Sequence, residues 1–237
     1  MLRIPQQQPY HRRPKRLPQE QRFSNYCLEF DGTTDQQITV PAFNLVAPYT
    51  MIKWIRYTVG AINQLAIWRR AGTFYFGVVG TGQLYLRAID GVGYTSPVAF
   101  AGILGIWQMI GIRALDDSTF NFILNDTLSA AVAVVAGTIE NNVIMTIGRN
   151  AQLPHNWDGG IDEFFHVGRA LTERDLQDVW HRGYARPMAG SLLNLRMEEG
   201  SGLTVFDTSG AGNHGTLVNN PAWTRVAKYE LLAESGV

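Results

Sequence analysis

The 237-residue chain has a length and composition suited to one large β domain, alone or with a terminal arm. Its 46% hydrophobic and 17% charged residues are typical of a globular protein that can fill a core, and its 24 glycines suit many tight turns. No stretch approaches the ~18 uninterrupted apolar residues of a membrane span. The basic, proline-broken N-terminus also lacks the apolar stretch of a secretory signal. We therefore expect no membrane partner and no secretory signal.

The zero net charge conceals an uneven distribution along the chain. Residues 1–22 carry six basic side chains against one acidic side chain, whereas the remainder carries 14 basic and 19 acidic side chains. This segment also has four prolines and almost no apolar side chains, so it cannot fold alone and favours extended backbone. It is either a free terminus or an assembly arm, and we predict the arm, docked on an acidic face of another subunit. Its basic residues are Arg3, Arg12, Arg13, Lys15, Arg16 and Arg22.

Nucleic acid is not an expected partner of this arm. Basic charge would attract phosphates, but Tyr10 is the only aromatic side chain of the segment that could stack on a base.

From Phe23 onward the pattern has period two, which is typical of half-buried β-strands. In one of these runs Leu84, Leu86 and Ala88 share a face. Runs of this kind lie at 73–79, 83–88, 107–114, 120–124, 132–135, 143–147 and 161–167. Strands of roughly six residues, separated by turns, predict two packed antiparallel sheets.

One helix is predicted at about 171–182. Thr172 and Asp175 resemble a capping box, and Gly183 stands where a left-handed residue would end the helix. Leu176, Val179 and Trp180 form an apolar stripe that should pack on the sandwich.

Cys27 is the only cysteine, so an intrachain disulfide is excluded and a small buried thiol is expected.

Three phrases at wide spacing resemble the laminin G-like branch of the concanavalin A-like jelly rolls. They are Leu28-Glu29-Phe30-Asp31-Gly32, then Gly159-Gly160-Ile161-Asp162-Glu163-Phe164, and a run from Glu198 to Trp223. The resemblance covers about residues 25–226. It implies an all-β, two-sheet antiparallel jelly-roll sandwich over 23–237, with one short helix and an extended N-terminal arm. It also implies a protein that binds a partner or forms part of an assembly, rather than an enzyme.

The order of the phrases departs from the usual family pattern. The segment 190–226 resembles a stretch that often precedes the Phe-Asp-Gly phrase, yet here it follows the helix. We predict that 190–226 returns to pair with the N-terminal strand, as in a permuted sandwich. The alternative is the start of a truncated second repeat, for which the remaining chain is too short.

The chain offers no catalytic constellation. Glycosidases of this superfamily need two carboxylates that converge on one face. Asp162 and Glu163 are adjacent, so on a regular strand they would point to opposite faces. We therefore predict that the protein is not an enzyme and requires no cofactor.

The resemblance places Asp31, Asp35 and Asp162 where family members supply oxygens to a structural calcium ion. The alternative is that Asp31 shapes its turn and that Asp162 satisfies nearby backbone amides.

Sugar binding would need exposed aromatic rings, and the loop 149–158 is the candidate, with His155 and Trp157. The alternative is that Trp157 anchors this loop in the edge of the core.

Two functions follow from these observations. The leading hypothesis is a structural assembly protein, namely a capsid-decorating or other virion protein of a phage. It would assemble in the host cytoplasm on a major capsid protein or on copies of itself. The alternative is a carbohydrate-binding adhesion module for surface glycans, and a glycan array would distinguish the two.

Overall fold

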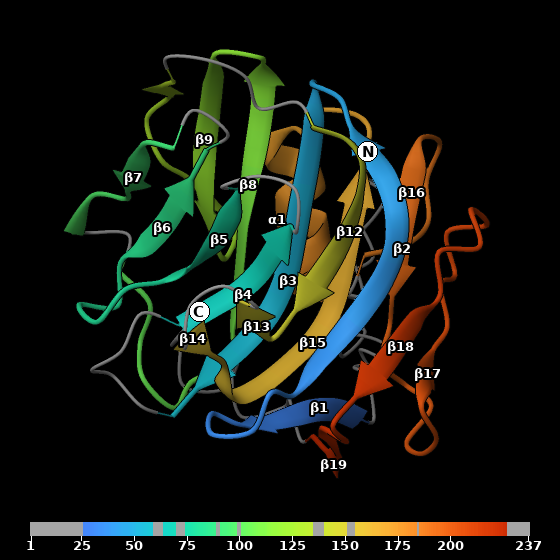
Figure 1. The fold of residues 1–237 in the computed structure, drawn as a ribbon. Coiled ribbons are helices and arrows are strands. Elements are labelled where there is room, and N and C mark those ends of the chain that lie inside the picture. The colour runs from blue at the N-terminus through green and yellow to red at the C-terminus, as the bar shows by residue number, and fades with distance from the viewer. Residues whose placement is uncertain are drawn as a thin grey trace, which may run out of the picture.

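The computed structural model describes residues 26–58, 64–69, 74–88, 91–98, 101–134, 140–150, 155–183 and 185–226. Within them the chain forms two antiparallel sheets packed face to face, with one helix outside (Figure 1). This confirms the predicted all-β sandwich with one short helix. The predicted arm, residues 1–22, lies outside the described residues.

The first sheet carries both the N-terminal strand and the last described strand. Its strands are β1 (Tyr26–Asp31), β3 (Tyr49–Tyr57), β8 (Gln108–Asp116), β9 (Thr119–Leu124), β10 (Thr127–Leu128), β11 (Val132–Ala133), β15 (Asp158–Val167), β16 (Ser191–Leu195) and β19 (Ala222–Arg225). Their order is β10-β9-β8-β3-β15-β1-β19, and β11 pairs with β9 and β16 with β15.

The second sheet faces the viewer in Figure 1. Its strands are β2 (Gln37–Leu45), β4 (Gln64–Arg69), β5 (Tyr75–Val78), β6 (Leu84–Arg87), β7 (Gly93–Thr95), β12 (Glu140–Ile147), β17 (Thr204–Val205) and β18 (Gly215–Val218). Their order is β17-β18-β2-β12-β4-β5-β6-β7, so β17 and β7 form opposite edges. A separate hairpin of β13 (Arg149–Asn150) and β14 (His155–Asn156) contacts β4.

Period-two alternation builds two cores on the two faces of the first sheet. On β3, Met51 and Ile55 join the inter-sheet core, whereas Ile52 and Trp54 join a second cluster on the outer face. Burial of both faces explains why almost every residue of β3 is shielded from solvent.

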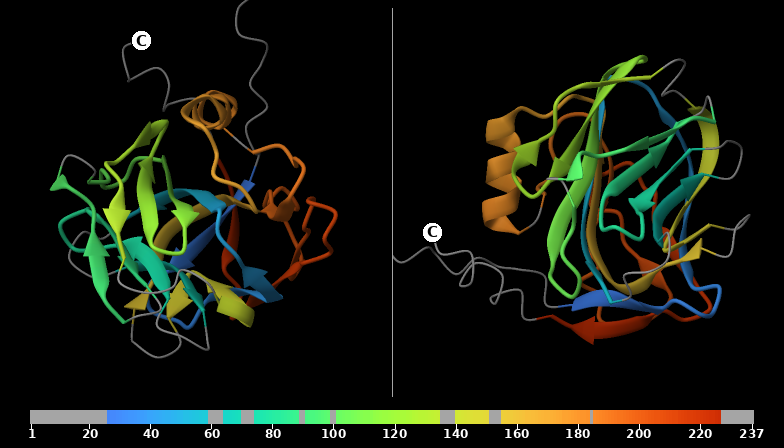
Figure 2. Two further views of the ribbon diagram at one scale, coloured as in Figure 1. Left: turned by 90° about the horizontal axis from the view of Figure 1, so that it is seen from above. Right: turned by 90° about the vertical axis from the view of Figure 1, so that its left-hand side faces the viewer.

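The helix α1 (Glu173–Arg182) covers this outer face, on the side away from the second sheet (Figure 2). Thr172 and Asp175 form the capping box, and Gly183 ends the helix in a left-handed conformation with φ of 73°. The ring of Trp180 stacks on that of Trp54, with centroids 4.8 Å apart. The predicted helix and the packing of Trp180 are therefore confirmed.

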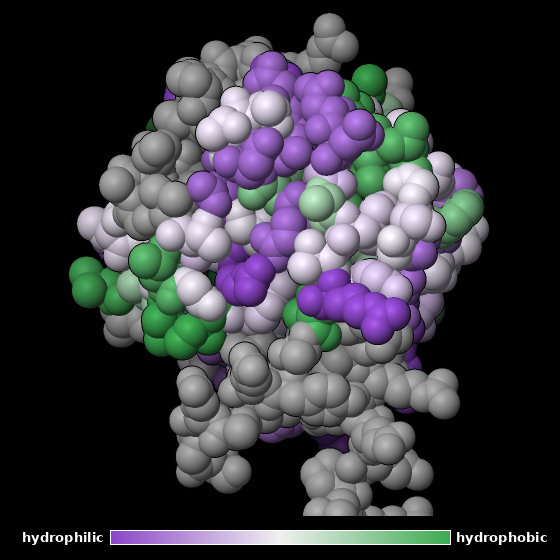
Figure 3. Space-filling view, turned by 90° about the horizontal axis from the view of Figure 1, so that it is seen from below, coloured by the Kyte–Doolittle hydropathy of each residue, from purple (hydrophilic) through white to green (hydrophobic). Residues whose placement is uncertain are grey.

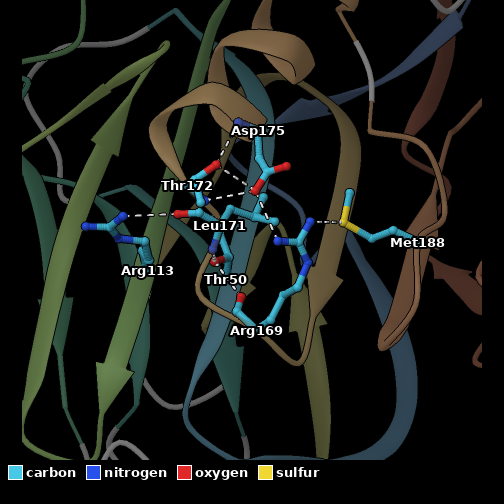
Figure 4. A network of polar contacts seen from close by, with 7 residues as sticks. All are labelled: Thr50, Arg113, Arg169, Leu171, Thr172, Asp175 and Met188. Carbon is cyan, nitrogen blue, oxygen red and sulfur yellow. Dashed lines mark hydrogen bonds and ion pairs between the residues drawn. The ribbon is translucent and has the colours of Figure 1, made fainter.

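Polar contacts hold the start of α1 on the first sheet (Figure 4). Thr50 Oγ1 donates to Arg169 O at 2.9 Å and accepts from Leu171 N at 2.9 Å. Arg113 Nη1 donates to Leu171 O at 3.0 Å from the neighbouring strand β8. These bonds satisfy backbone groups that the chain would otherwise bury unpaired as it leaves β15.

The C-terminal segment returns to the N-terminal strands. β19 pairs with β1, with Trp223 opposite Leu28, and β18 pairs with β2. The first and last described strands are therefore neighbours in one sheet, which is the arrangement a permuted sandwich requires.

No helix in the described part of the chain combines the length and apolar character that crossing a bilayer needs.

Candidate functional site: a tyrosine platform on the second sheet

Alternation along β5 and β6 places aromatic side chains on the outer face of the second sheet. Phe76 and Leu84 are buried in the inter-sheet core, so their neighbours Tyr75 and Tyr85 point away from it. Both tyrosines are half-buried, as is Arg87 on the same face of β6. We call Tyr75, Tyr85 and Arg87 the tyrosine platform.

Strand register brings the two rings together. Tyr75 lies opposite Arg87, and Gly77 lies opposite Tyr85, so the tyrosines are diagonal neighbours. Their ring centroids are 5.7 Å apart and their planes are tilted by 31°. Because Gly77 has no side chain, the ring of Tyr85 has room to lean toward Tyr75.

A second glycine fixes the other side of Tyr85. Its phenol ring lies across the backbone of Gly93 on β7, where a Cβ atom would collide with the hydroxyl oxygen. The Tyr85 ring is thus held against the backbone of Gly93, which is less mobile than a side chain would be.

Arg87 completes the platform with a positive charge. Its guanidinium lies over the Tyr75 ring, 5.8 Å from the centroid, and Nη1 donates to Tyr75 Oη at 3.4 Å. The bond to Tyr75 raises the pKa of Arg87 above its ordinary value. Burial, together with a hydrogen bond to Tyr75, raises the pKa of Tyr85. The Tyr85 hydroxyl therefore stays neutral at physiological pH beside a permanent cation.

This arrangement can bind but cannot perform acid–base hydrolysis. Half-exposed rings on rigid strands can stack on the C–H face of a sugar, while hydroxyl and guanidinium groups bond its oxygens. The three side chains include no carboxylate, whereas glycoside hydrolysis needs a pair of them.

The sequence model of the concanavalin A-like lectin/glucanase superfamily, in its laminin G-like form, matches residues 31–177, more than half of the chain. The chain belongs to this superfamily. No curated protein sequence matches it.

Solved structures share the fold at low identity. A candidate carbohydrate-binding protein from Bacteroides ovatus has a TM-score of 0.65 at 15% identity, over 86% of this chain and 61% of its own. The heptameric SAP-like pentraxin from Limulus polyphemus has a TM-score of 0.64 at 13% identity, over 86% and 97%. Domain 4 of the arabinanase AbnA from Geobacillus stearothermophilus, in complex with arabinotriose, has 0.53 at 15%, over 65% and 75%.

The chain spans less than two thirds of the Bacteroides ovatus protein. At these identities the likenesses establish a concanavalin A-like fold. The superfamily includes lectins, which favours the glycan-binding alternative over the virion hypothesis. The virion hypothesis rests on the arm, whose basic residues lie outside the described residues, and it stays a prediction.

The glycan-binding hypothesis for Trp157 needs correction. Trp157 is fully buried, its indole N–H donates to Gly160 O at 3.3 Å, and its ring meets Tyr57 edge-on at 6.3 Å. A ring with no exposed face cannot stack on a sugar, so the residue anchors its loop instead. His155 pairs with Asn150 in the β13–β14 hairpin, and its side chain lies outside the described part of the structure.

The three predicted calcium ligands do not form one site. Asp31 accepts bonds from the Thr33 and Thr34 amides at 2.9 Å, which shapes its turn. Asp35 pairs with Arg149 at 2.8 Å. Asp162 is buried near Cys27, four strand positions and about 13 Å along β1 from Asp31. Within the described ranges, no cluster of three His, Cys, Asp or Glu side chains could hold a metal.

Structural calcium stays a prediction. Thermal melting with and without EDTA would test whether bound calcium stabilises the protein.

Asp31 lies where β1 ends, and β1 and β19 occupy the lower end of the sandwich in Figure 1. Figure 3 shows the molecule from this side, with hydrophilic residues spread between separate hydrophobic patches.

The prediction that Asp162 and Glu163 diverge assumed a regular strand, and β15 is not regular there. A bulge separates the pairs Asp162–Trp54 and Phe165–Ile52, and Glu163 has a φ of 52°. Ile161 and Phe164 both join the inter-sheet core, which strict alternation would forbid. Glu163 instead pairs with Arg196 at 3.5 Å, so the carboxylate serves an ion pair.

Sequence reasoning missed the tyrosine platform, although part of its signal was present. The shared face of Leu84, Leu86 and Ala88 already places Tyr85 and Arg87 on the opposite face. The local sequence does not determine the register of β5 and β6. That register makes Tyr85 and Tyr75 diagonal neighbours.

Proposed function

We propose that this chain is a non-catalytic carbohydrate-binding module that holds a glycan on the tyrosine platform. The observation that carries the proposal is the pair of half-exposed rings of Tyr75 and Tyr85, 5.7 Å apart on adjacent rigid strands. Membership of a lectin-containing superfamily and the carbohydrate-binding proteins among its structural neighbours support it.

The physical basis of binding is the preorganisation of the two rings. A tyrosine has few rotatable bonds, so holding it in place costs little conformational entropy. Here the Gly93 backbone and the neighbouring ring fix Tyr85 before any ligand arrives. Stacking then removes apolar surface of both the tyrosine ring and the sugar from water. The tyrosine hydroxyls orient the sugar through directional hydrogen bonds.

A glycan array with the intact chain tests the proposal. The wild-type chain should bind at least one class of glycan saturably. Tyr85→Ala should weaken that binding roughly tenfold or more, as loss of a central aromatic contact usually does. Tyr85→Phe, which keeps the ring, should retain most of it.

Phe206→Ala is the matched control. Phe206 is an exposed aromatic residue, 54% accessible, that follows β17 at the opposite edge of the same sheet from β7. It should leave glycan binding unchanged. Thermal melting of each variant verifies that it is folded. The proposal fails if no glycan binds, or if Phe206→Ala weakens binding as much as Tyr85→Ala.

A further inference from the structure

Several surface arginines in the described part of the chain are paired with a carboxylate. Arg149 pairs with Asp35, Arg169 with Asp175, and Arg56 with Glu29. Within the described parts of the chain, no carboxylate forms an ion pair with Arg87. It contacts Tyr75 instead, through the ring and the hydroxyl. Tyrosine holds the guanidinium without neutralising it.

Gly91 lies beside the Arg87 guanidinium, and a Cβ atom at Gly91 would lie 3.6 Å from Nη2, at van der Waals distance. Because Gly91 has no side chain, nothing from this residue covers Nη2. The Nε–H is buried, so a ligand cannot reach it. Tyr75 holds the guanidinium through Nη1, and Nη2 has no hydrogen-bond partner among the described residues.

The neighbouring hydroxyls do not cancel this charge. The raised pKa of Tyr85 keeps its hydroxyl protonated at physiological pH, as described above. The platform therefore presents two aromatic rings, a neutral Tyr85 hydroxyl and one cation that has no ion pair with the described residues.

We infer that the tyrosine platform selects acidic glycans, with the carboxylate or sulfate of a sugar bound by Arg87 while its ring stacks on the tyrosines. This inference rests on the proposed function. A guanidinium matches the planar geometry of a carboxylate or the oxygens of a sulfate through two parallel N–H donors, and hydrogen bonds between charged partners are stronger than neutral ones. Since the group lies near the surface, the attraction should weaken as salt rises.

Matched pairs of ligands separate charge from sugar shape. An oligogalacturonate is compared with its methyl ester, and a sulfated galactan oligosaccharide with its neutral parent, by calorimetry on the full chain. In at least one pair the acidic member should bind roughly tenfold more tightly. Arg87→Gln should abolish that difference, because it should weaken binding of the acidic member far more than binding of the neutral member. Arg87→Lys should retain the salt dependence but lose part of the affinity.

The outcomes distinguish the inference from the proposed function. If the array gives glycan binding but neither acidic probe exceeds its neutral counterpart, acid selectivity is wrong and glycan binding stands. If the preference exists but survives Arg87→Gln, the assignment to Arg87 is wrong. If no glycan of any kind binds, the proposed function fails and this inference fails with it.

Discussion

Lys53 is the least expected residue of the interior. It lies on β3 between Ile52 and Trp54 but points the other way, into the inter-sheet core, where its Nζ sits 4.8 Å above the Phe76 ring. The side chain is 1% exposed, and Nζ has no hydrogen-bond partner in the described structure. Burial lowers the pKa of Lys53 well below its ordinary value.

Lys53→Met should therefore stabilise the protein near neutral pH, by about 1–3 kcal/mol, because it removes a buried polar group without a partner. The unfolded chain binds a proton at Lys53 up to its ordinary pKa of 10.5, whereas the folded chain releases it at lower pH. Wild-type stability should thus rise as pH increases toward 10.5, and the advantage of the variant should shrink. Urea denaturation of both proteins at pH 7 and near pH 10 measures this.

Ile55→Met is the control for this substitution, since it introduces the same side chain into the same core from the same strand and should not stabilise. A Lys53→Met variant that is less stable than wild type at pH 7 would contradict this interpretation of Lys53.

At the scale of elements, the helix shows how a local signal fixes a tertiary contact. Asp175 Oδ2 accepts bonds from the Thr172 backbone at 3.0 Å and from Arg169 Nη1 at 3.0 Å. Arg169 Nη2 also reaches the Met188 sulfur at 3.0 Å. The bond to Arg169 is the main stabilising contact that lowers the pKa of Asp175, although partial burial acts in the opposite direction. The capping box is therefore tied to the segments before and after the helix.

Thr172→Ala removes the hydroxyl that accepts from Asp175 N at 3.2 Å, and it should cost about 1 kcal/mol of unfolding free energy. Arg174→Ala, an exposed change in the same turn, should alter stability by less than about 0.5 kcal/mol. Chemical denaturation of both variants measures the difference. Equal losses would show that the cap does not stabilise the helix.

The strands show where sequence reasoning ends. Alternation of Leu84, Leu86 and Ala88 located β6, and Thr172 with Gly183 bounded the helix, because each pattern is local. The bulge at Glu163 and the burial of Trp157 depend on partners far along the chain, so neither follows from local alternation. The tyrosine platform depends on register between strands, for the same reason.

At the scale of the whole molecule, a basic N-terminal segment precedes a body with more acidic than basic residues. β1 begins at Tyr26 and is held between β15 and β19, so the described sandwich starts after the predicted arm. The virion hypothesis requires that arm, and glycan binding by the platform does not.

Deletion of residues 1–22 should therefore leave the melting temperature nearly unchanged and leave glycan binding intact, because no described strand is lost. If the protein belongs to a virion, the truncated chain should also fail to co-purify with particles. Incorporation of the truncated chain at the wild-type level would remove the docking role of the arm.

The central claim is that Tyr75 and Tyr85 form the glycan site, and a crystal structure of the chain with the best ligand from the array tests it most directly. We predict a sugar ring stacked on these tyrosines, on the outer face of the second sheet, with its polar groups toward Arg87. A glycan seated instead at the 149–158 loop or at the lower end of the sandwich, with the tyrosines empty, would contradict it.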